Sequence, residues 1–249
     1  MRKNISALRV FLVAVAAFVG IASLEAQGWE FGVGVGYNIG GSMPMPLPQE
    51  IRAIETYSPD AFAPHIAGEA LRWLNDKWGV AVQIAYDVKG FEVRDRVKSL
   101  YTEIEMDDGS VQNGNFTGKN TTQVRNIYLS TPVMAVFNTS KRWSSRAGIY
   151  VAWLASPTFR GSASDGYLRN GSPIGEKIEV PNATFDFSSH QNRIDYGLQM
   201  GEQWNLGGKI YVFGQLNWGL RPLFPDDFNA MSFRMRNVYG TVGLSYMIF

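Results

Sequence analysis

The sequence of 249 residues contains no cysteine and only two histidines. The absence of cysteine excludes disulfide bonds and thiolate metal sites. The two imidazoles, His65 and His190, lack the spacing of a pair of metal ligands, so we expect no metal site. Gly32, Gly34 and Gly36 alternate along a predicted strand and do not open a helix, which excludes a nucleotide loop. We therefore predict no cofactor.

The chain also lacks a large net charge of either sign. Residues 1–26 place basic side chains ahead of an apolar run from Val10 to Leu24, which is the layout of a secretory signal peptide. The run is shorter than the roughly 20 residues of a spanning helix, which disfavours a membrane anchor. Removal of this segment takes three basic and one acidic residues from totals of 23 and 22, leaving 20 and 21. This near-neutral balance gives no support to nucleic-acid binding.

No apolar run long enough for a spanning helix follows residue 26. Residues instead alternate in character with a period of two. In Trp29–Gly40 (WEFGVGVGYNIG), aromatic and aliphatic residues occupy the odd positions, whereas glycine, glutamate and asparagine occupy the even ones. The pattern recurs in residues 78–91, 194–204 and 210–221. These segments are long enough for tilted strands that cross a bilayer in about 9–11 residues.

Eight segments carry this pattern, at about 28–40, 64–74, 77–92, 123–138, 143–160, 191–205, 208–221 and 232–249. Short turns near 75–77, 139–141 and 206–208 alternate with long connections at 41–63, 93–122, 161–190 and 222–231. A soluble β-sandwich would also alternate, but glycine-rich inner faces and aromatic residues at strand ends favour a membrane wall. We therefore predict an all-β fold, in which residues 27–249 form an eight-stranded antiparallel up-and-down transmembrane β-barrel. Both chain ends would be periplasmic and the long loops outside.

The lumen of an eight-stranded barrel has room only for side chains. Glycine on the inner face relieves crowding, and ionised groups in the lumen must pair with one another. A conducting pore is therefore not expected. We predict a structural polar network formed by these residues: Glu30, Asp87, Lys89, Arg125, Arg146, Asp195, Arg221 and Arg236.

Three short motifs resemble a known family. Ile127–Phe137 (IYLSTPVMAVF), Asp195–Trp204 (DYGLQMGEQW) and the ending VGLSYMIF resemble strands of the PorT-like outer-membrane barrels of Bacteroidetes-type bacteria. The resemblance implies a place in the bacterial outer membrane, contact with its lipid, and insertion by an assembly machinery that recognises the terminal Phe249. It also implies a role in protein secretion or envelope assembly, with proteins of those systems as partners.

Two classes of function fit this sequence. The first is a monomeric, non-enzymatic barrel that acts as a structural or binding component through its outside loops, one of which contains an Asp108–Gly109 turn signal and is predicted to project as a hairpin. The alternative is a lipid-modifying enzyme, a deacylase or acyltransferase, with a rim site near Ser188 and His190. These two side chains would lie on the same face of a strand, about 7 Å apart, which is too far for a direct hydrogen bond. A polar strand entry is therefore the favoured interpretation, and we predict no enzymatic activity.

Overall fold

The computed structural model describes residues 28–106, 109–170 and 174–248. Its strands are β1 (Trp29–Pro44), β2 (Ile51–Pro59), β3 (Pro64–Trp73), β4 (Trp78–Met106), β5 (Val111–Asn138), β6 (Trp143–Ser156), β7 (Phe159–Arg169), β8 (Lys177–Asp186), β9 (Ile194–Gly207), β10 (Ile210–Gly219) and β11 (Met235–Met247). One short 3-10 turn covers Ser188–His190. In the described part of the chain, no helix is long and apolar enough to cross a membrane. The predicted all-β fold is confirmed, and the signal peptide lies outside the described residues.

Within the described residues the sheet has eleven strands, so the expected count of eight is wrong for the sheet as a whole. Each of the eight predicted segments forms a strand, but three more strands lie in predicted loops. β2 lies in the first long connection, and β7 and β8 lie mostly in the third. The predicted strand 143–160 is in fact β6 and the start of β7, separated at Pro157, which has no N–H for a ladder hydrogen bond.

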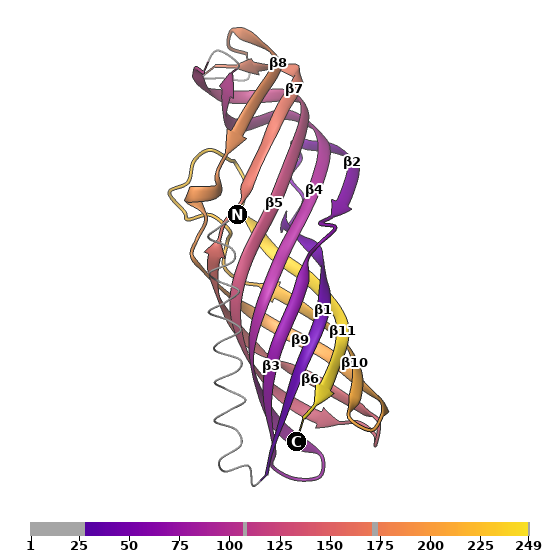
Figure 1. Cartoon of the computed structure of the whole chain (residues 1–249). Coiled ribbons are helices and arrows are strands. Elements are labelled where there is room, and N and C mark those ends of the chain that lie inside the picture. Colours follow the sequence, from indigo (N-terminus) through magenta and orange to yellow (C-terminus); the bar gives the residue numbers. More distant parts are fainter. Residues whose placement is uncertain (1–27, 107–108, 171–173, 249) are drawn as a thin grey trace.

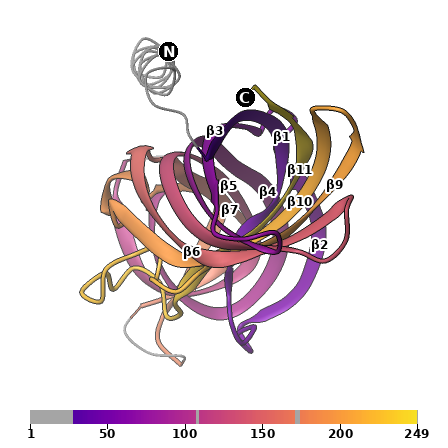
Figure 2. The ribbon, with the colours of Figure 1, turned by 90° about the horizontal axis from the view of Figure 1, so that it is seen from below.

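The strands pair antiparallel in the order β2-β4-β3-β1-β11-β10-β9-β6-β5-β7-β8, and β4 also pairs with β5. Eight of them, β4-β3-β1-β11-β10-β9-β6-β5, therefore form a continuous series whose two outer members are hydrogen-bonded to each other. Figure 1 shows this series in the lower part of the molecule, and Figure 2 shows its strands curving around a common axis. The short turns all lie at the lower end.

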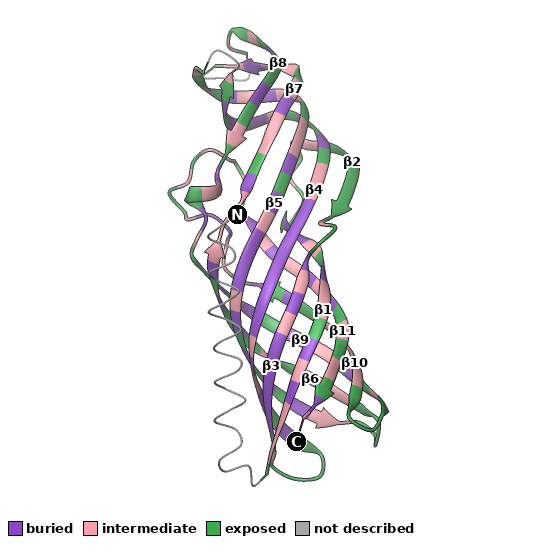
Figure 3. Ribbon diagram, viewed as in Figure 1, coloured by how far each residue is buried: buried purple, intermediate pink, exposed green. Residues whose placement is uncertain are grey.

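The two faces of each strand differ as the alternation predicts. On β1, Val35 is 59% exposed and Ile39 46%, whereas Asn38 between them is fully buried. The buried and exposed residues alternate along the ribbons in Figure 3. Glycine is needed on the inner face because strands cross closely there: a Cβ on Gly36 would lie 2.7 Å from the carbonyl oxygen of Val242. The face of β1 that carries aliphatic and aromatic side chains therefore points outward, and its glycine-rich face points inward.

Exposed aromatic side chains lie in two rows on the outer face of the eight-strand series. The lower row contains Trp78, Trp143, Trp204 and Tyr246, and the upper row contains Trp153, Tyr196 and Trp218. On β6 the two rows are ten residues apart. At about 3.4 Å per residue and a tilt of about 35–45°, this spacing is about 24–28 Å along the axis, which matches the apolar band of a membrane barrel.

Above the series, β4 and β5 continue as a long hairpin, which confirms the predicted projection, although the turn at residues 107–108 lies outside the described residues. β2 pairs with β4, and β7 pairs with β5. β8 pairs with β7 and touches the tip of β4. We call this unit the upper extension: β2, residues 91–106 of β4, residues 111–124 of β5, β7 and β8. It has its own apolar core, which includes Leu100, Ile104 and Phe116.

Candidate functional site

The interior of the eight-strand series is filled by polar side chains in layers. In the lowest layer, the guanidinium of Arg146 forms an ion pair with Glu69 and donates a hydrogen bond to Gln203. Gln83 donates to the same Glu69 carboxylate at 2.6 Å. Glu30 lies near this pair and is hydrogen-bonded to Trp73. The charges of this layer thus face one another.

Asp87 is the centre of the next layer. Its carboxylate contacts the Nδ1 atom of His65 at 2.7 Å and accepts hydrogen bonds from Ser130 at 2.6 Å and Asn38 at 3.2 Å. Asn38 in turn accepts a hydrogen bond from Thr241. Each of these five residues is at least 95% buried. The contacts join five neighbouring strands of the series, so this layer ties β11, β1, β3, β4 and β5 together.

Lys89 lies above Asp87 and is enclosed by aromatic rings. Its ammonium nitrogen lies 5.2, 5.3 and 5.5 Å from the ring centroids of Tyr128, Tyr150 and Tyr239. No ion pair to Lys89 within 4.0 Å occurs among the described residues, so cation–π attraction and the more distant charge of Asp87 stabilise its ammonium group. Asp195 completes this layer by accepting hydrogen bonds from Tyr150 at 3.0 Å and from an asparagine of β11 at 2.9 Å.

Three predicted members of the polar network lie elsewhere. Arg125 is 40% exposed and pairs with Asp60 outside the interior. Arg236 lies on the outer face of β11, and its register partner on β1, Met43, is exposed. Arg221 lies beyond the end of β10 and donates to an asparagine at 3.2 Å. Arg125 and Arg236 were expected in the interior, and the structure corrects this expectation. The reason is strand parity, because each of them lies on the same face of its strand as apolar residues that point outward. Phe249 lies outside the described residues.

The sequence reasoning missed several residues that complete the layers, namely Asn38, His65, Glu69, Gln83, Tyr128, Tyr150 and Tyr239. Parity along each strand was the available signal. On β3 the inner face contains His65, Glu69 and also the apolar Leu71. Because this face mixes polar and apolar residues, the sequence does not show which face of β3 points inward. On β5 and β6 the inner tyrosines have the same residue type as outward aromatics, which makes them indistinguishable without register.

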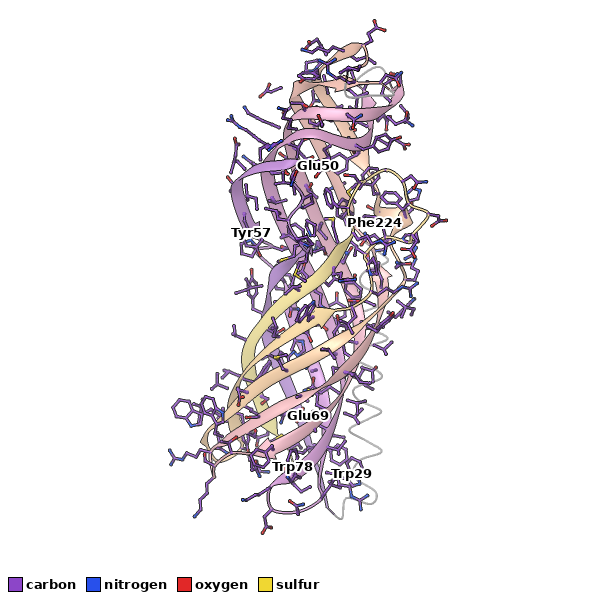
Figure 4. All side chains as sticks on the ribbon, turned by 180° about the vertical axis from the view of Figure 1, so that it is seen from behind. Trp29, Glu50, Tyr57, Glu69, Trp78 and Phe224 are labelled. Carbon is purple, nitrogen blue, oxygen red and sulfur yellow. The ribbon has the colours of Figure 1, made fainter. Side chains whose placement is uncertain are left out.

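The connection between β10 and β11 was predicted as an outside loop, but it folds inward. Leu223 and Phe224 are buried, and they pack with Phe91, Phe159 and Phe187 above the polar layers. The ring of Phe224 lies 5.1 Å from that of Phe159 in an edge-to-face contact. Figure 4 shows Phe224 well above Glu69, where the eight-strand series meets the upper extension. This apolar cluster closes the interior from above.

A cavity of about 380 Å³ lies between this apolar cluster and the core of the upper extension. Aromatic side chains from below and Leu100, Ile104 and Phe116 from above line it. Close-packed interiors rarely leave spaces much larger than a water molecule, whereas ligand pockets measure about 300–1,000 Å³. The cavity thus has the size and lining of a small-molecule site, and we take it as the candidate binding site.

One carboxyl group, that of Asp95 on β4, lines this cavity. Asp95 is 6% exposed, and Asn120 donates a hydrogen bond to it at 2.9 Å. Burial raises the pKa of the Asp95 carboxyl to about 6, and the negative charge of Glu55 adds to the rise. No cation forms an ion pair with Asp95 within the described residues. The site therefore combines apolar walls with one acidic group that lacks a positive partner.

Several side chains that line the cavity also reach the surface. Met43 is 40% exposed, Leu47 56%, Ile54 56% and Tyr57 45%. They belong to the end of β1, the following connection and β2, whose other edge has no strand partner in the described chain. Tyr57 lies on the surface at the level of Phe224, on the opposite side of the molecule (Figure 4). These four residues form what we call the mouth of the cavity.

The side chains of the rim residues Ser188 and His190 are not hydrogen-bonded to each other. The hydroxyl of Ser188 accepts a hydrogen bond from the backbone N–H of Phe159 at 2.9 Å. His190 instead approaches Ser189, with 3.4 Å between Nδ1 and Oγ, and its ring packs on Phe228. A nucleophile and its base need a hydrogen bond of about 2.6–3.2 Å. The contacts of Ser188 are those of a turn residue.

Comparisons with known proteins identify a family. A model described as outer membrane protein beta-barrel domain matches residues 22–225. No curated protein matches the chain. Similar solved structures include the attachment invasion locus protein Ail of Yersinia pestis in complex with the heparin analogue sucrose octasulfate (13% identity, TM-score 0.37, 88% of this chain and 97% of that chain covered). Another is Ail of Yersinia pestis in a phospholipid bilayer nanodisc (14% identity, TM-score 0.36, 89% and 100% covered). The family match extends over β1 to β10.

Proposed function

Because the chain belongs to the outer membrane protein beta-barrel domain family, we propose that it is a monomeric binding component that works through its upper extension, without a catalytic step. The family match places the protein in the bacterial outer membrane. The observation that carries the proposal is the cavity of about 380 Å³, which the strands of the upper extension and the apolar cluster enclose. Exposed strands and loops on a rigid scaffold are the usual place for binding.

The proposal includes a closed, eight-stranded transmembrane barrel as the scaffold. Its support is the pairing of β4 with β5, which joins the two outer members of the eight-strand series. The two aromatic rows on the outer face also support it, because tryptophan and tyrosine gather at the two membrane interfaces. In this arrangement the upper extension stands outside the cell and the short turns face the periplasm.

The finer proposal is a PorT-like role, as a component of protein secretion or envelope assembly. It is supported by the strand motifs Ile127–Phe137 and Asp195–Trp204, which form much of β5 and β9. Those motifs serve the scaffold, because Tyr128 and Asp195 belong to the polar layers of the interior. The partners of this role are therefore expected at the upper extension.

The test is a pull-down from crosslinked outer membranes with a tagged protein and a shortened variant. Replacing residues 98–117 by Asn-Gly keeps the register pair Val97 and Gly118 next to the new turn. We expect envelope or secretion proteins to copurify with the complete protein and to be lost from the variant. Recovery of the same proteins with both forms, or of none with either, would contradict a binding role of the upper extension.

The absence of a catalytic step is tested at His190. Its imidazole is the only one near the rim serine residues, so a lipid-modifying enzyme would depend on it. We expect a strain with His190→Ala to have the same outer-membrane lipid composition by mass spectrometry as the parent. His190→Phe is the matched control, because it keeps a ring against Phe228 and removes the imidazole base. A change in acyl-chain number in both variants would support the enzymatic alternative instead.

A further inference from the structure

The cavity of the upper extension surrounds a single acidic group with apolar walls. We propose that it binds a single-chain amphiphile whose head group is a protonated amine, with the chain between the apolar cluster and the upper core and the amine at Asp95. This inference deepens the proposed binding function and rests on it. It assigns the chemical class of the ligand and the residue that selects the head group.

The walls determine the chain part of the ligand. Phe91, Phe159 and Phe187 form one side of the cavity, and Leu100 and Phe116 form the other. Water in such a space finds few polar partners, so an apolar chain is favoured over solvent. The cavity opens at the mouth, so a flexible chain can lie along the apolar walls with its head group at Asp95.

The carboxyl group determines the head group. Among described residues Asp95 is hydrogen-bonded only to the neutral amide of Asn120, and Glu55 adds negative potential nearby. An ionised carboxylate that is buried without a cation is unfavourable, and a ligand ammonium would neutralise it. A hydroxyl head would offer only a neutral hydrogen bond, and a carboxylate head would be repelled.

The position of the mouth defines the route by which the ligand enters the cavity. Val35, Ile39 and Met43 form an exposed apolar row along the outer face of β1, and Met43 also lines the cavity. Leu47 and Ile54 continue the apolar surface past the end of that row. A chain can therefore reach the cavity from the outer leaflet along this apolar row. The same amine chemistry could also arrive from the medium as a free amphiphile.

The experiment uses the complete protein in nanodiscs of phosphatidylcholine and a photoreactive dodecylamine. Matched photoreactive dodecanol and dodecanoic acid serve as comparison probes, and mass spectrometry of peptides locates the crosslinks. We expect saturable labelling of peptides that contain Met43, Met231 or Phe116, and we expect the amine to label at much lower concentration than the alcohol or the acid. The ¹³C-methyl signals of Met43 and Met231 should shift with the same concentration dependence, because both residues line the cavity.

The head-group assignment is tested with Asp95→Asn, which keeps the side-chain shape and removes the charge. We expect roughly a 10- to 100-fold loss of affinity for the amine, the size expected for a hydrogen bond between charged groups, and little change for the alcohol. Asp165→Asn is the matched control, because Asp165 lies in the same extension but is exposed and paired with Lys119. Native folding of each variant is checked by heat-modifiable migration.

Three outcomes would overturn the proposal. They are equal labelling by amine and alcohol, unchanged amine affinity in Asp95→Asn, and the absence of saturable labelling in folded wild-type protein. Nanodiscs that contain lysophosphatidylethanolamine, which has one acyl chain and an amine head group, distinguish the source: competition by this lipid supports an amine from the leaflet, and competition only by soluble dodecylamine supports a free ligand. Failure here leaves the pull-down result unaffected, so the binding role and the ligand class are tested separately.

Discussion

At the scale of single residues, the ion pair of Glu69 and Arg146 is the most buried pair of permanent charges in the described interior. Replacing Arg146 by Met leaves the Glu69 carboxylate in the interior without a cation. We expect the free energy of unfolding to fall by about 3–5 kcal/mol, as for other broken buried pairs. Urea titration in lipid vesicles, followed by tryptophan fluorescence, measures this change.

Two further variants make this prediction specific. Combining Arg146→Met with Glu69→Gln removes both charges and should recover most of the lost stability. Arg96→Met breaks the pair with Glu55, whose side chains are 61% and 36% exposed, and should change the free energy of unfolding by less than about 1 kcal/mol. Equal effects of the buried and exposed variants would contradict the assigned role of the interior pair.

Asp95 gives a pH dependence at the same scale. Its pKa rises from 3.8 to about 6 on folding because of burial, so the folded state holds the proton more tightly than the unfolded state. The contribution of Asp95 to stability is therefore most favourable below about pH 4, decreases between about pH 4 and 6, and stays constant above that. Asp95→Asn should remove this decrease and stabilise the upper extension at pH 7 by at most about 2–3 kcal/mol.

Hydrogen exchange of peptides from β4 and β5 at pH 4 and pH 7 measures this difference. The exposed Asp165→Asn variant provides the reference, because its carboxyl is solvated and already paired with Lys119. A wild-type protein whose extension is equally protected at both pH values would show that Asp95 is not strained by burial.

At the scale of elements, the hairpin of β4 and β5 has two parts with separate partners. Residues 78–91 of β4 pair with β3 and the lower part of β5, whereas residues 91–97 pair with β2. The variant in which Asn-Gly replaces residues 98–117 should therefore insert and show heat-modifiable migration with a β-type circular dichroism spectrum. Its β7 should exchange amide hydrogens faster, because three register partners on β5 are lost. Failure to insert would show that the upper extension is required for assembly.

At the scale of the whole molecule, the filled interior predicts that the protein is electrically closed. The layers around Glu69, Asp87 and Lys89 are bridged by hydrogen bonds and cation–π contacts, and the apolar cluster around Phe224 covers them. We expect no stable single-channel conductance in planar bilayers at neutral pH. Steady open steps from the purified monomer would contradict this filled interior.

The sequence by itself determined which segments become the eight strands of the series and which face of most of them points inward. Both properties are local, because a period of two fixes the side of every residue once one side is apolar. Asp87, Lys89, Arg146 and Asp195 lie in the interior, on the inner parity of their strands. The period of two also explains the projecting hairpin, whose alternation continues past residue 92.

Only the tertiary structure decided where the long connections go. β2, β7 and β8 form because the extended parts of β4 and β5 present free edges to them, and such pairing depends on contacts between residues far apart in the chain. The inward fold of Leu223 and Phe224, and the cavity around Asp95, arise in the same way. No local pattern marks them, because a cavity is a property of the surfaces that several elements bring together.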